Sequence, residues 1–193
     1  MNGWSLTYEG FLPTEEGLRE ALCTLGNGVF ATRGAAPEAV ANEVHYPGTY
    51  AAGVYDRLRT EIAGRTVENE DLVNLPNWLV LTFRPGGGDW LDLGSVEVLS
   101  YMQELDLRTG VLSRAFRFRD ADGRTTGVRQ RRLVSMAEPH LAALETTIVP
   151  EDWSGRLEVR SGLDGAVTNS GVARYRSLRG DHLVPRSSRT LGD

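Results

Sequence analysis

The sequence predicts a mainly β protein, an antiparallel β-sandwich with one short helix near the N-terminus. Three observations support this fold class. Apolar and polar residues alternate with a period of two along most of the chain, turn residues recur about every ten positions, and a single short segment has helical spacing. A sandwich explains this pattern better than an alternation of helices and strands.

The helix is predicted over about residues 15 to 24. Thr14 is expected to cap its start, and Gly26 is expected to end it in a left-handed turn. One apolar face is predicted from leucines at three-to-four spacing, Leu18, Leu22 and Leu25. We therefore expect this helix to pack its leucines onto a sheet.

The clearest hairpin is predicted between residues 111 and 134. Val111 to Arg119 places alternate apolar side chains on one face, and Asp120-Ala-Asp-Gly123 supplies turn residues. Arg124 to Val134 then returns in step. Further strands are predicted at Trp78–Arg84, Trp90–Leu93, Val96–Leu107, Leu141–Val149, Leu157–Leu163 and Val172–Leu178. Pro-Gly-Gly-Gly after Arg84 is interpreted as a hairpin turn, because a strand rather than a helix is predicted to follow it.

Length and composition indicate one folded domain. The chain has 193 residues, of which 40% are hydrophobic and 24% charged, values typical of globular proteins. We assign residues 1–180 to the sandwich and 181–193 to the start of a linker, where apolar alternation is lost. The single Cys23 excludes an internal disulfide framework and predicts no thiolate metal site.

The charge and the N-terminal sequence limit the partners. A net charge of −5 argues against nucleic acid, because binding to phosphates requires clustered positive charge. The N-terminus has no basic and apolar leader pattern, and no apolar run is long enough to cross a membrane. We expect a cytoplasmic protein without a membrane partner.

Two segments outside the clear alternation supply the candidate site residues. An irregular aromatic loop contributes His45, Tyr46 and Tyr50, and the run Glu68-Asn-Glu-Asp-Leu-Val-Asn-Leu-Pro-Asn-Trp-Leu79 contributes Glu68, Asn69, Glu70, Asp71, Asn77 and Trp78. Their mixture of polar and aromatic side chains outside clear alternation predicts that both segments are contact surfaces. Tyrosine and tryptophan rings can also cover the apolar face of a sugar, a role open to Tyr46, Tyr50, Tyr55 and Trp78.

Two other interpretations of charged residues were weighed. Acids in the Glu68 run could act as paired carboxylates in glycoside chemistry, but in a strand Glu68 and Glu70 share one face while Asn69 and Asp71 face the other way. Contacts to turn amides or to a neighbouring domain are favoured. Arg129-Gln-Arg-Arg132 could bind phosphate, but a solvated strand face paired with acids is the favoured interpretation. No catalytic residue is assigned in this chain.

Several ordered motifs carry a family resemblance. They are Glu20-Ala-Leu-Cys-Thr-Leu-Gly-Asn-Gly28, Tyr46-Pro-Gly-Thr-Tyr50, the Glu68 run, Gln103-Glu-Leu-Asp-Leu-Arg-Thr-Gly110 and Ser135-Met-Ala-Glu-Pro-His140. With these motifs, nearly the whole chain resembles the N-terminal domain of glycoside hydrolase family 65, which includes maltose, trehalose and kojibiose phosphorylases. The resemblance implies a super-sandwich of the galactose-mutarotase-like kind.

The resemblance also implies a function for the parent enzyme. Such enzymes cleave an α-glucosidic disaccharide with inorganic phosphate as co-substrate, invert the anomeric centre and release β-glucose 1-phosphate and a sugar. The acid that protonates the leaving oxygen lies in a separate (α/α)6 barrel, which this chain does not match. The chain is thus expected to be inactive alone, with that barrel as its partner and with no cofactor, and the parent enzyme is expected to be a homodimer. We expect the two candidate segments to contact the barrel or the rim of its sugar site. A family 65 hydrolase or a free-standing carbohydrate-binding module remain alternatives.

Overall fold

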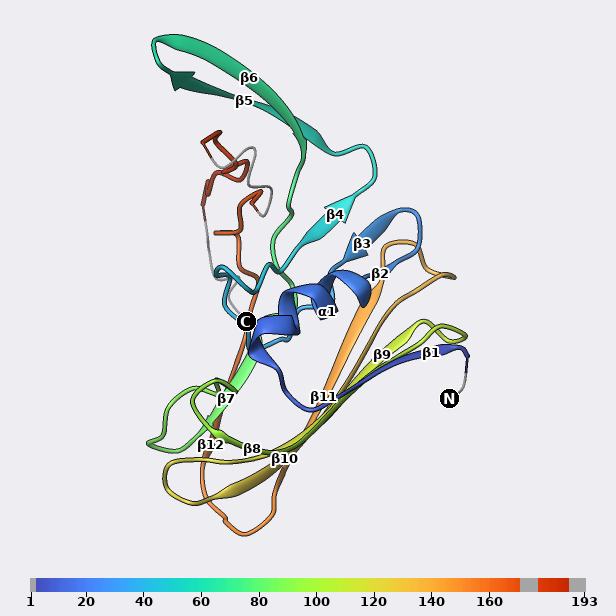
Figure 1. Ribbon diagram of the computed structural model, residues 1–193, viewed down its shortest axis with the longest axis vertical. Coiled ribbons are helices and arrows are strands. Elements are labelled where there is room, and N and C mark those ends of the chain that lie inside the picture. Colours follow the sequence, from blue (N-terminus) through green and yellow to red (C-terminus); the bar gives the residue numbers. More distant parts are fainter. Residues whose placement is uncertain (1–2, 171–176, 188–193) are drawn as a thin grey trace.

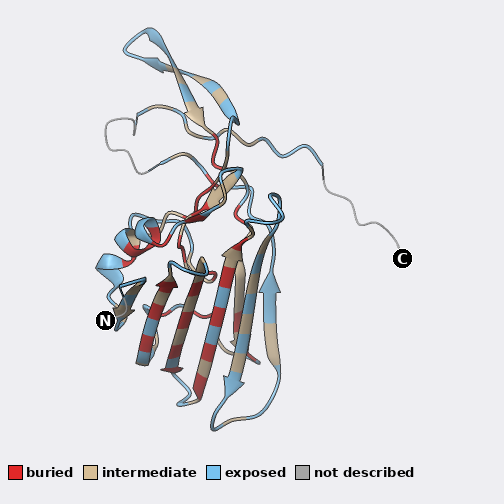
Figure 2. Ribbon diagram, turned by 90° about the vertical axis from the view of Figure 1, so that its right-hand side faces the viewer, coloured by how far each residue is buried: buried red, intermediate tan, exposed pale blue. Residues whose placement is uncertain are grey.

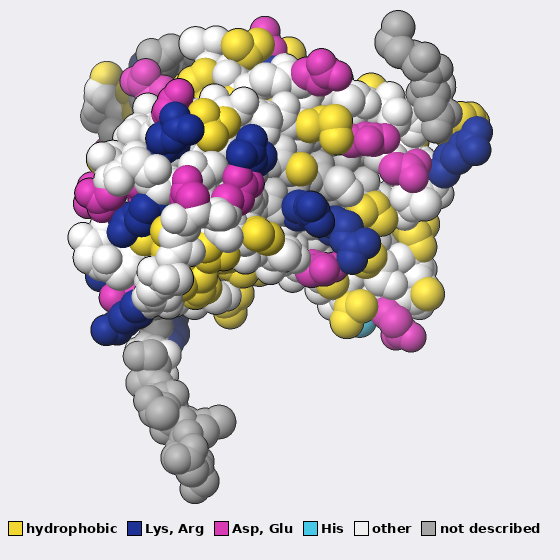
Figure 3. Space-filling model, turned by 90° about the horizontal axis from the view of Figure 1, so that it is seen from below, with side chains coloured by type: hydrophobic (Ala, Val, Ile, Leu, Met, Phe, Trp, Pro, Cys, Tyr) yellow, Lys and Arg dark blue, Asp and Glu magenta, His cyan; other side chains and the backbone are white. Residues whose placement is uncertain are grey.

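The computed structural model describes residues 3–170 and 177–187. Within these ranges the chain is mainly antiparallel β, as predicted, and its longest helix has seven residues (Figure 1). Across the same ranges, no helix has the length and hydrophobicity that a membrane crossing requires. Basic, acidic and apolar side chains lie interspersed on the face viewed from below (Figure 3).

One layer is a five-stranded sheet in the order β1-β8-β9-β10-β11, with every neighbouring pair antiparallel. Its strands are β1 (Ser5–Glu9), β8 (Glu97–Asp106), β9 (Val111–Arg119), β10 (Thr125–Val134) and β11 (Ala142–Pro150). Buried and exposed residues alternate along its central strands (Figure 2). The hairpin predicted from residue 111 to 134 is confirmed, and Gly123 in its turn has a φ of 83°, which favours glycine.

The second layer lies against one end of the inner face of this sheet. It contains β7 (Leu81–Pro85) and β12 (Leu157–Ser161), which pair antiparallel with Phe83 opposite Val159. The apolar core between the layers consists of Phe83, Leu91, Leu93, Tyr101, Phe116, Phe118 and Val128. This arrangement of two packed layers is the predicted sandwich.

The other end of the molecule is built from shorter elements. A three-stranded sheet contains β2 (Leu25–Gly26), β3 (Phe30–Thr32) and β4 (Thr49–Ala51). Beyond it, β5 (Tyr55–Ile62) and β6 (Arg65–Leu72) form a hairpin that projects from the body (Figure 1). Sequence analysis predicted none of these five strands, because they are short or carry charged side chains in place of apolar ones.

The predicted helix is present but its details were wrong. A 3₁₀ turn, η1 (Pro13–Glu15), leads into α1 (Glu16–Leu22), and no side-chain hydrogen bond caps either start, so Thr14 is not a cap. The helix ends at Leu22 with Cys23 as its C-cap, and Gly26 belongs to β2. Leu18 and Leu22 face solvent, being 62% and 50% exposed, while Glu16, Arg19 and Glu20 face the sheet. The inversion arises because buried residues of the sheet, among them Gln103 and Arg114, are polar.

Two strand predictions also need correction, and a third is not tested. Residues 90–93 are not a strand: only the Leu91 amide reaches a neighbouring strand, donating to the Phe83 carbonyl at 3.0 Å. Their alternation reflects the burial of Leu91 and Leu93 in the core from a loop. The strand predicted from Trp78 begins only at Leu81. The strand predicted at Val172–Leu178 falls largely on residues 171–176, which lie outside the described residues.

Candidate functional site

A cleft forms where the two predicted segments approach each other. Its volume is about 230 Å³, and its walls come from the loop at residues 37–47, the segment at 74–82 and the segment at 160–170. Both predicted segments contribute, because Tyr46 and Asn77 line it. Apolar groups such as Val40 and Val80 mix there with polar ones. We call this the loop cleft.

The aromatic loop is held to α1 by the buried carboxylate of Glu20. One oxygen of Glu20 lies 2.7 Å from His45 Nδ1, and the other accepts the Tyr46 backbone N–H at 2.9 Å. The hydrogen bond to Glu20 raises the pKa of His45, against the opposing effect of its partial burial. The side chain of His45 remains 21% exposed, so the loop presents part of an imidazole to the surface.

The two tyrosines of the loop contact each other. The Tyr46 and Tyr50 hydroxyls lie 2.6 Å apart, and the Tyr46 hydroxyl accepts the Ser170 N–H at 3.2 Å. Burial and the hydrogen bond to Tyr46 raise the pKa of Tyr50, so this phenol stays protonated. The Arg33 guanidinium lies 5.2 Å from the ring centre of Tyr46 and donates to its carbonyl at 2.9 Å. One ring face of Tyr46 is therefore already covered.

Asn74, which sequence reasoning missed, organises the segment between β6 and β7. Its fully buried side chain accepts the Thr49 N–H at 3.0 Å and donates to the Pro47 and Thr168 carbonyls at 3.2 and 3.1 Å. The side chain thus joins three separate stretches of chain around the loop cleft. An Asn flanked by apolar residues was the available signal, since a buried amide needs such partners.

Asn77 and Trp78 are largely internal. The Asn77 side chain accepts the Leu79 N–H at 3.0 Å, and its backbone pairs with Asp164 in an isolated bridge. Trp78 is half-buried, and its indole N–H has no hydrogen-bond partner among the described residues. Asn77 thus shapes one wall of the loop cleft through its backbone pairing.

The four acidic and amide residues before them lie on β6, away from the lining of the loop cleft. Glu68 and Glu70 share one face, as the alternation predicted, and form ion pairs with Arg59 at 3.0 Å and Arg57 at 2.5 Å. Both acids are thereby held in a charged cross-strand ladder. Their pairing with guanidinium groups favours a structural role over acid catalysis.

Asn69 and Asp71 occupy the opposite face of the hairpin. There the buried ring of His182 lies between two carboxylates, with Nε2 3.2 Å from Asp71 and Nδ1 3.1 Å from Asp56. Asn69 donates to the Arg179 carbonyl at 3.3 Å. The segment at residues 177–187 is thereby fastened along the hairpin. No cluster of three or more His, Cys, Asp or Glu side chains suited to a metal occurs among the described residues.

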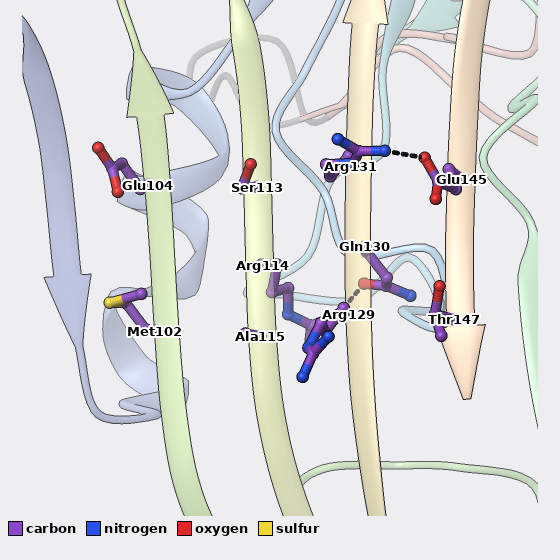
Figure 4. Close-up of a pocket in the computed structure, with 10 residues that line it drawn as sticks. All are labelled: Met102, Glu104, Ser113, Arg114, Ala115, Arg129, Gln130, Arg131, Glu145 and Thr147. Atoms are coloured by element: carbon purple, nitrogen blue, oxygen red, sulfur yellow. Dashed lines mark hydrogen bonds and ion pairs between the residues drawn. The ribbon is translucent and has the colours of Figure 1, made fainter. Parts of the chain in front are cut away.

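A second concavity, the sheet groove, lies on the outer face of the five-stranded sheet (Figure 4). Its volume is about 380 Å³. The small side chains of Ser113 and Ala115 form its floor between larger residues of β8 and β10. Arg131 pairs with Glu145 at 2.5 Å, whereas Arg129 has no side-chain partner among the described residues. The predicted pairing of this strand face with acids is thus confirmed only at Arg131.

On its inner face the same sheet carries a buried polar cluster. Arg114 donates to both oxygens of Glu38, at 2.5 and 2.9 Å, and to Gln130 at 3.0 Å. Arg132 donates to the Ala35 carbonyl at 2.7 Å, and burial lowers its pKa to about 10. These contacts attach the loop that lines the loop cleft to β9 and β10. The inward position of Arg114 in the alternation was the signal for this cluster.

The sequence of this chain is similar to those of known proteins. The family model described as "Glycosyl hydrolase family 65, N-terminal domain" matches residues 6–193. The chain is 53% identical over 190 residues to an "uncharacterized glycosyl hydrolase" of Mycobacterium tuberculosis, covering 98% of the chain and 14% of that protein. It is 32% identical over 165 residues to a kojibiose phosphorylase of Halothermothrix orenii, covering 86% of the chain and 20% of that protein.

Two further similarities complete the comparison. A trehalose 6-phosphate phosphorylase of Lactococcus lactis is 34% identical over 161 residues, covering 83% of the chain and 20% of that protein. A solved structure titled "putative kojibiose phosphorylase from human microbiome" superposes with a TM-score of 0.75 at 22% identity, over 85% of this chain and 22% of that one. That structure shares the fold. The chain spans between 14% and 22% of the length of these relatives.

Proposed function

Because the chain belongs to the N-terminal domain family of glycosyl hydrolase family 65, we propose that it is the non-catalytic sandwich of a larger enzyme acting on α-glucosidic disaccharides. The membership confirms the resemblance stated from the motifs. The observation that carries the proposal is the short span of the match, at most 22% of each relative or structure described above, three of which are named as phosphorylases.

The proposed reaction is phosphorolysis with inversion. Inorganic phosphate attacks the anomeric carbon, the glycosidic bond breaks, and one carboxylic acid protonates the leaving oxygen. Phosphate takes the place of the activated water in an inverting hydrolase, so the protein needs to supply only that acid. Glu68 and Glu70 are held in ion pairs with Arg57 and Arg59, so we place the acid in the remaining chain. The products are β-glucose 1-phosphate and a free sugar.

The role proposed for this domain is to support the catalytic part. The predicted contact residues retain exposed faces that support this role: Glu68 and Glu70 lie outward on the projecting hairpin, and His45 is partly exposed beside α1. Tyr46 and Tyr50 then position the loop rather than stack on sugar. We further propose that the enzyme is a homodimer, as the resemblance implies, and that it is cytoplasmic. Residues 1–180 form its sandwich, and a linker starts near residue 181.

Hydrolysis is the second candidate activity, because the relative with the highest identity quoted above is named a glycosyl hydrolase. The deciding assay incubates the full-length enzyme with kojibiose, maltose, trehalose, trehalose 6-phosphate and nigerose, with and without phosphate. We expect sugar release that depends on phosphate, with β-glucose 1-phosphate identified by NMR. Equal release without phosphate would identify a hydrolase.

A separate experiment tests whether this domain binds sugar on its own. Isothermal titration of the 193-residue chain with α-glucans is expected to show no binding in the micromolar range. Micromolar affinity would favour a carbohydrate-binding module and would point to the loop cleft or the sheet groove as its site.

A further inference from the structure

The helix α1 has its amphipathic pattern reversed. The side chains turned toward the sheet are Glu16, Arg19, Glu20 and Cys23, all less than 5% exposed, whereas Leu18 and Leu22 point outward. Buried charges and exposed leucines are the informative departures from usual burial. The inward charges are paired, since Arg19 contacts Glu16 at 3.2 Å and Glu20 holds the aromatic loop, although Arg19 Nε has no hydrogen-bond partner among the described residues. The reversal is therefore built into the fold.

The outward leucines share one side of the helix. Leu18, Ala21 and Leu22 are exposed and, at 100° per residue, occupy one arc of the helix. The backbone of the exposed residue Val44 passes beside α1, because a Cβ at Gly17 would lie 2.6 Å from the Val44 carbonyl oxygen. We call Leu18, Ala21, Leu22 and Val44 the outer helix patch.

The rim of the outer helix patch is acidic. Glu15 precedes the helix and Glu43 precedes Val44, and both are exposed, although Glu15 also pairs with Arg19 at 3.3 Å. An exposed apolar patch with a polar rim is typical of a protein interface. The rim fits a partner surface that carries basic groups around an apolar centre.

We propose that the outer helix patch is the surface on which the remainder of this polypeptide docks. The docking segment would carry an apolar spot flanked by basic side chains. The inference rests on the proposed function, in which this domain is a minor part of a longer chain. Its relatives extend well beyond the matched region, by about 78 to 86% of their length, as the covered shares of 22% and 14% show. A tethered surface has a high effective concentration, so a small patch is enough for stable docking.

The test measures whether the outer helix patch is covered in the full-length enzyme. Leu18→Cys and Leu22→Cys are introduced singly, and the rate of iodoacetamide modification is followed by peptide mass spectrometry, natively and in denaturant. We expect native modification to be slower than denatured by more than about tenfold, which is the effect of a local opening equilibrium. The control is Asp122→Cys at the exposed β9–β10 turn, which should react at similar rates in both states.

Two results would overturn the proposal. Leu18→Cys and Leu22→Cys could react natively as fast as the Asp122→Cys control, which would mean that the helix face is open in the whole enzyme. Alternatively, protection could vanish on dilution to monomer, followed by light scattering, which would assign the patch to a second copy. Neither outcome depends on catalysis, so a negative phosphorolysis assay would refute the proposed function separately.

Discussion

The buried ion pair between Glu38 and Arg114 tests how the loop that lines the loop cleft is attached to the five-stranded sheet. Both side chains are nearly inaccessible, at 6% and 7% exposure, and the contact is bidentate. In Glu38→Gln one acceptor oxygen becomes an NH₂ group that faces the guanidinium. A buried cation then loses its counter-charge, which typically costs about 3–5 kcal/mol.

The geometry places the expected loss near the lower end of that range. Arg114 keeps its hydrogen bond to Gln130 and its position 4.5 Å from the ring centre of Phe116, so its charge is not left wholly without partners. We expect about 3 kcal/mol, which corresponds to a fall of roughly 1.5 M in the urea midpoint at a slope of about 2 kcal/mol per M. Urea unfolding followed by tryptophan fluorescence measures it.

A double variant separates the pair from its surroundings. Glu38→Leu combined with Arg114→Met removes both charges, and we expect it to unfold within about 1 kcal/mol of the wild type. Glu145→Gln, which breaks the exposed pair with Arg131, should leave the midpoint unchanged. The reasoning would be refuted if Glu38→Gln lowered the free energy of unfolding by less than about 1 kcal/mol, or if the double variant were less stable than the single variant.

Three other predictions follow from individual contacts. The pKa of His45 is raised above its ordinary 6.5 by Glu20, so the interaction of His45 with Glu20 stabilises the fold fully below pH 6.5. This stabilisation is lost as the pH rises through the folded pKa, and the urea midpoint should fall. His45→Gln should remove this fall. Gly34→Ala should cost about 1–3 kcal/mol, since its Cβ would lie 2.8 Å from that of Cys23, whereas Gly162→Ala, with open space, should be neutral. His182→Gln should speed hydrogen exchange of the Arg179 amide, which donates to a hairpin threonine, by more than about tenfold.

Each of these predictions has its own contrary result. For His45, a midpoint that rises or stays level above pH 6.5 would show that the imidazole gains nothing from the glutamate. Equal stability of the two glycine variants would show that the helix can move away from β3 at little cost. Unchanged exchange at Arg179 would mean that the 177–187 segment is held by other contacts.

Much of the sandwich could be predicted from the sequence because alternation is a local property. From Val111 to Val134 the polarity of each side chain indicates which face of the strand it lies on, and Gly123 marks the turn. The register of the hairpin therefore follows from residues that are close in sequence. The β5–β6 hairpin was not predicted, because its outer face is a ladder of Arg and Glu side chains that has no apolar periodicity. Its charges satisfy each other only once the strands are paired.

Within the candidate site, the sequence by itself determined the family motifs, the shared face of Glu68 and Glu70, and the choice of Tyr46 and Asn77, which line the loop cleft. Only the tertiary structure decided that α1 turns its charges inward and that Glu38 meets Arg114 across 76 positions. The physical reason is that helical spacing shows which residues share a face, whereas the chemistry of the opposing surface decides which face is buried. Here the buried residues of the sheet include polar ones, and the polar side of the helix is buried with them. These sheet residues are Gln103, Arg114, Gln130 and Arg132.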